Sequence, residues 1–143
     1  AASLGAGVAP GAAPELGVLP VEMMTAAAAD PVFAGVPASF RSLQWHGDTF
    51  ELPKGATQLA RSATFEQQAF VLGRAYALQF HLEVTSTLAR EWMEIPDYLS
   101  EIELIDGAGA ETRLLEQVAA VESESVPLAR ALFGRWLDHV VGL

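Results

Sequence analysis

Alternation of apolar and polar residues predicts a series of short strands in the first part of the chain. Side chains two positions apart share one face of a strand, so this alternation is typical of half-buried strands that end at glycine or proline. Little more than Gly73-Arg74 separates the last two segments, which predicts a tight hairpin. The segments that fit the pattern are residues 16–24, 42–50, 57–63, 68–73 and 75–80.

Glycine and proline mark the segments around these strands. Residues 1–14 carry no charge, and we expect them to finish a helix at Gly5 or Gly7 and to continue as a loop. Residues 30–40 are interrupted by two prolines and a glycine, which favours an ordered loop. The strand at 42–50 is expected to enter a turn at Gly47-Asp48.

The hydrophobic period changes from that of a strand to that of a helix after His81. Thr85 or Ser86 is a candidate N-cap for the first helix, and Pro96 is expected to break or restart it. Pro127 is expected in the first turn of the last helix. The helices predicted in this way are residues 85–95, 111–121 and 125–141.

Strands followed by helices favour an α/β or α+β fold, in which helices cover a sheet. The length of 143 residues fits a single domain. Within that domain we expect residues 1–105 to form the core and residues 106–143 to form a helical C-terminal extension.

Charge and composition exclude several functions. The formal net charge is −10 with only eight Lys and Arg, which argues against nucleic-acid partners and anionic membrane surfaces. The sequence has no cysteine, so it holds no disulfide and no thiolate metal site, and the cytoplasm is the default location. Hydrophobic residues make up 51% of the chain, which suggests apolar surface that another segment or chain covers.

His81 and Glu83 are the first candidates for catalysis. In the segment AYALQFHLE, both residues fall on the same face if the chain stays extended to Glu83. Glu83 would accept a hydrogen bond from the N–H of one ring nitrogen of His81 and leave the other nitrogen free as a base. The alternative from spacing alone is an ordinary polar end of a strand.

His46 and Asp48, in the segment WHGD, are the second candidates. The Gly47 between them allows a ligand to approach the backbone, whereas the alternative is a simple turn. Together with His81 and Glu83 they supply side-chain types suited to zinc or iron, but no tight ligand spacing supports a metal site.

Several segments together resemble the class I glutamine amidotransferases, whose catalytic triad is Cys, His and Glu. The last triad motif of that family is a strand ending in Phe-His-Pro-Glu, and this chain reads QFHLEV with His81 and Glu83 in register. Leu82 replaces the usual proline. The segments DPVFAGVPASF and LQWHGDTFELPKGATQLARSA further resemble the stand-alone subgroup related to the amidotransferase domain of GMP synthase. The resemblance covers residues 1–95.

This resemblance implies a flavodoxin-like open sheet with flanking helices, of which the chain forms the second half. The segment AASLGAGV resembles the end of the helix that follows the family's nucleophilic cysteine. The cysteine and the first strands would then lie upstream of Ala1. A missing N-terminal half or a partner chain would cover the sheet, in which we expect parallel strands.

The activity implied is that of a glutaminase, which hydrolyses the side-chain amide of glutamine through a cysteinyl thioester. His81 and Glu83 would be catalytic, and His46, Gly47 and Asp48 would line the substrate site. A synthase partner would receive the ammonia, and no cofactor or metal is implied.

Three other hypotheses remain open at this point. The chain would act as a non-catalytic amidotransferase-like module for binding or assembly, or as a γ-glutamyl hydrolase with the same triad. A metal-dependent hydrolase is a more distant alternative.

Overall fold

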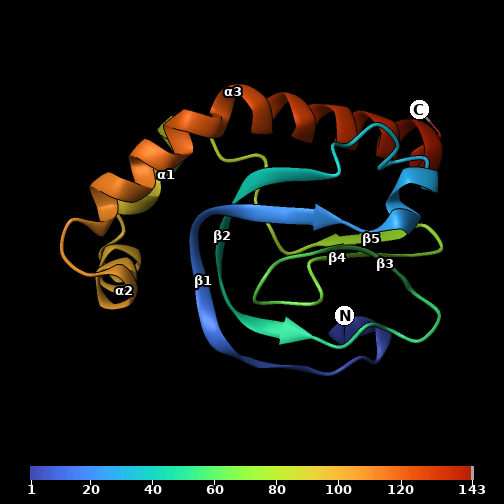
Figure 1. Ribbon diagram of the computed structural model, residues 1–143, viewed down its shortest axis with the longest axis horizontal. Helices are drawn as coiled ribbons and strands as arrows, with labels where there is room; N and C mark the ends of the chain where they lie inside the picture. The colour runs from blue at the N-terminus through green and yellow to red at the C-terminus, as the bar shows by residue number, and fades with distance from the viewer. Residues whose placement is uncertain (143) are drawn as a thin grey trace.

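A five-stranded sheet in the order β2-β1-β3-β4-β5 forms the framework of residues 1–142, the part of the chain that the computed structural model describes. Figure 1 shows the long helix α3 running along one side of this sheet, with α1 and α2 near one end. The strands are β1 (Val8–Met23), β2 (Ser39–Phe50), β3 (Thr57–Arg61), β4 (Ala69–Leu72) and β5 (Ala75–Leu78). The α-helices are α1 (Ser86–Met93), α2 (Pro96–Asp106) and α3 (Ala110–Trp136). Short helical turns are η1 (Ala2–Leu4), η2 (Thr25–Ala29) and the π-helical η3 (Leu137–Val141).

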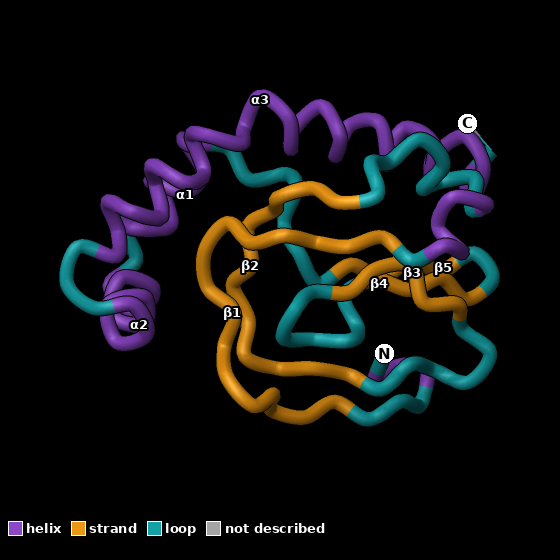
Figure 2. Tube along the Cα trace, in the orientation of Figure 1, coloured by secondary structure: helices purple, strands orange, loops and turns teal. Residues whose placement is uncertain are grey.

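The strands β1 and β2 form a long antiparallel ribbon that curls around the shorter strands (Figures 1 and 2). The expected loop before residue 15 is wrong, because residues 8–10 pair with the end of β2, where Pro10 lies opposite Asp48. The expected turn at Gly47-Asp48 is wrong for the same reason. A register shift between Pro10 and Glu15 absorbs the intervening glycine and proline, so long-range pairing overrides the local turn preference.

The other strands follow the sequence pattern closely. η1 ends at Gly5, whose φ of 81° is the left-handed conformation expected of a C-cap glycine. β3 lies within the segment predicted at 57–63. β4 and β5 pair antiparallel around Gly73-Arg74, which confirms the predicted hairpin.

The α/β class, with an open sheet and flanking helices, is confirmed. The expected parallel pairing is not found in residues 1–142, where the paired strands β1–β2, β1–β3, β3–β4 and β4–β5 are all antiparallel. β5 forms one edge of this sheet and β2 the other.

The first two helices begin and end where capping chemistry places them. The side chain of Thr85 accepts a hydrogen bond from the N–H of Leu88 at 3.1 Å, which confirms Thr85 as the N-cap of α1. Pro96 is the first residue of α2, where its missing N–H costs no helical hydrogen bond, so the proline restarts the helix.

The expected break before residue 125 is wrong, because α3 is continuous and contains Pro127 in its interior. A proline within a helix cannot donate to the carbonyl four residues earlier, which belongs here to Ser123. Ser123 is exposed, so the missing hydrogen bond falls on the solvent-facing side of the helix. Buried residues on both sides of the proline, Val121 and Leu132, anchor the helix across it.

Two hydrophobic clusters form the core. Val18 of β1 belongs to the cluster that also contains Leu114 and Val118 of α3. Val21, three positions further along β1, belongs to the cluster that contains Leu132 near the end of α3. The two clusters therefore share both β1 and α3, and residues 106–142 pack into the same core as the strands.

No helix in residues 1–142 has both the length and the apolar character needed to cross a bilayer.

The N-cap of α1 provides a test of this fold. We expect Thr85→Ala to lower the free energy of unfolding by about 1 kcal/mol, because the amide of Leu88 loses its acceptor. Thr87→Ala, at an exposed position inside the same helix, is the matched control and should change stability by about 0.5 kcal/mol or less. Urea denaturation measures both, and equal effects of the two substitutions would contradict the capping role.

Candidate active site

The backbone of His81 is held by two neighbouring residues of β2. Its N–H donates to the carbonyl oxygen of Leu43 at 2.8 Å, and its own carbonyl accepts from the hydroxyl of Ser42 at 2.7 Å. The sequence predicts His81 at the end of a strand. β5 ends at Leu78, however, and His81 lies beyond it in an isolated bridge to β2. This single bridge to β2 fixes the backbone of His81 between bends at residues 79–80 and 82–83.

The imidazole of His81 and the carboxylate of Glu83 form a close pair. The distance from Nδ1 of His81 to Oε1 of Glu83 is 2.8 Å. Leu82 and Val84 are buried at 4% and 3% exposure, whereas the side chains of His81 and Glu83 are 33% and 59% exposed. Buried and more exposed side chains therefore alternate along residues 81–84, as the sequence pattern predicts, although the chain bends at Leu82 and Glu83 instead of staying extended.

This geometry sets the proton positions of the pair. The hydrogen bond from His81 lowers the pKa of Glu83 below its ordinary value, against the opposing effect of burial. An ionised Glu83 accepts only, so Nδ1 of His81 carries the proton and donates it. The other ring nitrogen, Nε2, is then left as a base in the neutral ring and a donor in the charged ring.

His81 faces open space beside the edge strand of the sheet. A cleft of about 700 Å³ lies between β5, the segment that follows it and the second half of α3. His81 and Glu83 supply polar groups to a lining that is otherwise mainly apolar, which is the usual composition of a small-molecule site. Apolar residues of this cleft include Phe33, Tyr76, Leu78, Phe80, Leu132, Phe133 and Trp136.

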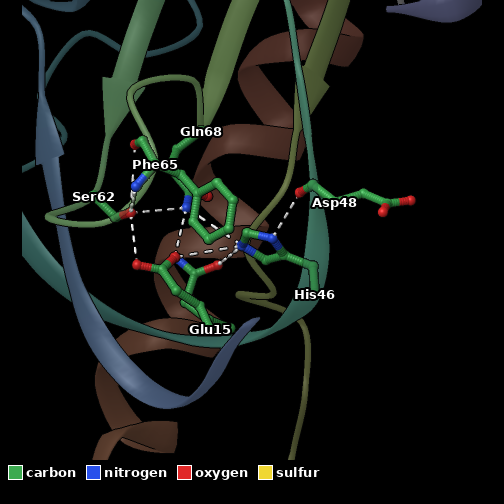
Figure 3. A network of polar contacts seen from close by, with 7 residues as sticks. Glu15, His46, Asp48, Ser62, Phe65 and Gln68 are labelled. Carbon is green, nitrogen blue, oxygen red and sulfur yellow. Dashed lines mark hydrogen bonds and ion pairs between the residues drawn. The ribbon is translucent and has the colours of Figure 1, made fainter. Parts of the chain in front are cut away.

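His46 lies in a different, buried environment with Glu15. These two residues are direct partners in the β1–β2 ladder, and Nε2 of His46 lies 3.4 Å from Oε2 of Glu15. The side chains are only 8% and 4% exposed. Glu15 also accepts from the hydroxyl of Ser62 at 2.7 Å and from the amide of Gln68 at 2.8 Å (Figure 3).

Burial lowers the pKa of His46, and the nearby His81 lowers it further, although the contacts with Asp48 and Glu15 oppose this shift. Nδ1 of His46 donates to the backbone oxygen of Asp48 at 3.1 Å, so Nε2 of the neutral ring is an acceptor. Oε1 of Gln44 lies 3.1 Å from that nitrogen, while the buried Nε2 of Gln44 has no partner. Exchanging the two ends of this amide lets its N–H donate to Nε2 of His46, which favours the neutral ring, and places the amide oxygen in the position without a partner.

The segment WHGD is therefore divided between two roles. His46 points into the buried network, and its ring contacts Phe65 with a centroid distance of 4.8 Å. Gly47 and Asp48 are exposed, and Figure 3 shows the carboxyl group of Asp48 pointing away from the network. The four candidate ligands of a metal do not converge, since no group of three potential metal-ligand side chains occurs in residues 1–142.

Sequence reasoning missed several residues that build this site. Ser42 and Leu43 position His81. The sequence gives no signal for this role, because the two residues precede His81 by 39 and 38 positions. Glu15 was missed for the same reason. Its one local signal is that it is the charged residue between two uncharged segments at the start of β1.

Comparison with known proteins supports a relationship to amidotransferases. No protein-family model matches the chain. A stretch of 86 residues is 42% identical to a GMP synthase (glutamine-hydrolyzing) of Thermomicrobium roseum. This stretch covers 59% of the chain and 16% of that synthase. The crystal structure of a glutamine amidotransferase from Thermotoga maritima matches 94% of the chain with 36% identity and a TM-score of 0.84. The resemblance to the class I glutamine amidotransferases is confirmed.

A second amidotransferase structure, from Methylobacillus flagellatus, matches 98% of the chain at a TM-score of 0.80 and 24% identity, and so supports the fold alone. The chain spans 56% and 58% of the lengths of these two amidotransferases. It thus corresponds to a little over half of each solved amidotransferase.

The buried histidine predicts a specific pH dependence. Because the pKa of His46 is lower in the folded chain than in the unfolded chain, its contribution to stability is present above the unfolded value and is lost as the pH falls through the lowered pKa. His46→Gln should therefore cost about 1–3 kcal/mol near pH 7.5 and less near pH 5. Urea denaturation at the two pH values measures this, with His139→Gln, at an exposed histidine, as the control. A cost that does not change with pH would contradict the buried neutral ring.

Proposed function

We propose that the chain supplies the histidine and the carboxylate of a glutaminase site that releases ammonia from glutamine. The observation that carries this proposal is the 2.8 Å pair of His81 and Glu83, which lines the 700 Å³ cleft beside an edge strand. The likeness to a solved amidotransferase over 94% of the chain supports it.

The reaction requires a thiol that the 143 residues do not contain, so a cysteine from outside this sequence takes the role of nucleophile. Its thiolate attacks the side-chain amide carbon of glutamine, and the charged His81 gives a proton to the departing ammonia. The neutral His81 then takes a proton from water, which attacks the thioester to release glutamate, and the thiolate and the charged His81 are regenerated. Glu83 holds the imidazole orientation and stabilises its charged form.

We assign the lining of the substrate site to the exposed end of WHGD. Gly47 and Asp48 are exposed on β2, and Gly47 has no side chain to block approach to the backbone. His46 supports these residues from the buried side through its hydrogen bond to the backbone of Asp48. The ammonia would pass to a synthase partner, and the similarity to a protein named as a glutamine-hydrolyzing GMP synthase supports this proposal.

His81 gives the direct test of this function. In the complete protein, His81→Ala should lower glutaminase kcat/KM by about 10²–10⁴-fold without changing the fold, because the leaving group and the water lose their proton carrier. Glutamine hydrolysis, far-UV circular dichroism and the control His139→Ala complete the experiment. Unchanged activity would exclude the catalytic role of His81. Activity on γ-glutamyl amides but not on glutamine would identify the γ-glutamyl hydrolase instead.

We further propose that a segment outside residues 1–143, or a partner chain, covers the cleft and the β5 edge. Leu78 and Phe133 line the cleft and are 45% and 62% exposed, which is unusual for large apolar side chains that share one surface. β5 also ends the sheet, so its outer backbone groups are open to another strand.

A charge at Phe133 tests whether this surface is covered. In the complete protein, Phe133→Asp should destabilise the fold by more than about 2 kcal/mol, because it buries an unpaired carboxylate. Leu104→Asp is the matched control, since Leu104 is 87% exposed on α2 and lies outside the cleft. Thermal unfolding compares them, and equally small effects would show that the cleft is open to solvent.

A further inference from the structure

A second cavity lies beside the candidate catalytic pair and is lined largely by aromatic rings. Its volume is about 400 Å³, and its lining comes from β2, α1, α2 and the segment after β5. We call it the aromatic cavity. Its lining residues are Trp45, His81, Trp92, Tyr98 and Glu101.

The rings of the aromatic cavity stand at steep angles to one another. Trp45 contacts Trp92 at a centroid distance of 5.8 Å and an angle of 70°, and contacts Tyr98 at 5.3 Å and 62°. Trp92 in turn stands at 79° to His81 at 5.8 Å. These are edge-to-face contacts, the arrangement in which aromatic rings pack, and Trp45 and Trp92 also pack against a core cluster. The rings therefore form one fixed wall, whose outer side borders the cavity.

Glu101 adds a negative charge to the same cavity. The indole N–H of Trp45 donates to Oε2 of Glu101 at 3.2 Å, which fixes the tryptophan ring and the carboxylate relative to each other. Glu101 is exposed and Tyr98 is 40% exposed, so solutes reach the cavity from solvent. The chain as a whole has a formal charge of −10, which attracts cations toward it.

We propose that the aromatic cavity binds an organic ammonium group. Aromatic faces attract cations through the negative charge above the ring, and a carboxylate at the same site adds ionic attraction. A neutral apolar ligand would gain nothing from Glu101, and an anion would be repelled by it. The site involves no thiol, so it does not depend on the proposed glutaminase chemistry. It shares His81 with the cleft, which places the bound ammonium group next to the candidate catalytic pair.

Choline and its uncharged carbon isostere, 3,3-dimethyl-1-butanol, provide the test. Both are titrated into the ¹⁵N-labelled protein that contains this chain, and the indole N–H resonances, assigned by single Trp→Phe substitutions, are followed. We expect choline to shift the resonances of Trp45 and Trp92 in a saturable way and to leave Trp136, which lines the other cleft, unchanged. The isostere should bind at least about fivefold more weakly, because it lacks the charge.

Glu101→Gln and Glu103→Gln are the matched pair of variants. Both remove one charge from an exposed glutamate of α2, but only Glu101 lines the cavity. We expect Glu101→Gln to weaken choline binding about threefold or more and Glu103→Gln to change it little.

Three results would overturn the proposal. They are the absence of a saturable shift at Trp45 and Trp92, equal binding of the isostere, and equal weakening by the two glutamate variants. The first result would leave the rings as packing between the helices and β2. The second result would mean that the cavity binds choline through apolar contact alone. The third would mean that binding depends on the net charge of the chain and not on Glu101. His81→Ala in the glutaminase assay tests the amide chemistry separately, so the two proposals fail independently.

Discussion

The antiparallel pairing of β1 with β2 is the constraint on which the rest of the structure depends. Its register places Glu15 directly opposite His46, so the two side chains meet on one face of the ribbon. The same strand β2 offers Ser42 and Leu43 to the backbone of His81. Without this pairing, the backbone of His81 would lose these two hydrogen bonds to β2, and the histidine would lose its fixed position.

Two histidine–glutamate pairs therefore lie close together in very different surroundings. His46 and Glu15 are almost completely buried, and burial lowers the pKa of that histidine. His81 and Glu83 are partly exposed, and both line the cleft beside β5. The same residue types thus support the sheet in one place and form the proposed catalytic pair in the other, and the two pairs differ mainly in exposure.

His81 also connects the two cavities of this face of the molecule. One is the apolar cleft along β5 and α3, and the other is the aromatic cavity against α1 and α2. The apolar residues of the cleft belong partly to the core cluster that includes Leu132. The core therefore continues to the surface at this cleft, where Leu78 and Phe133 remain exposed, and this accounts for part of the hydrophobic composition of the chain.

Local sequence determined the hairpin around Gly73-Arg74, the cap at Thr85 and the shared face of His81 and Glu83, because each depends on residues only a few positions apart. It failed at Gly47-Asp48 and at Pro127, where residues with turn or breaking preferences lie inside regular elements. Pairing with β1 and packing of α3 against both core clusters outweigh those preferences. The contact of Glu15 with His46, and the position of His81 against β2, join segments about 30 to 40 residues apart and required the tertiary structure, because strand register is set by the whole sheet.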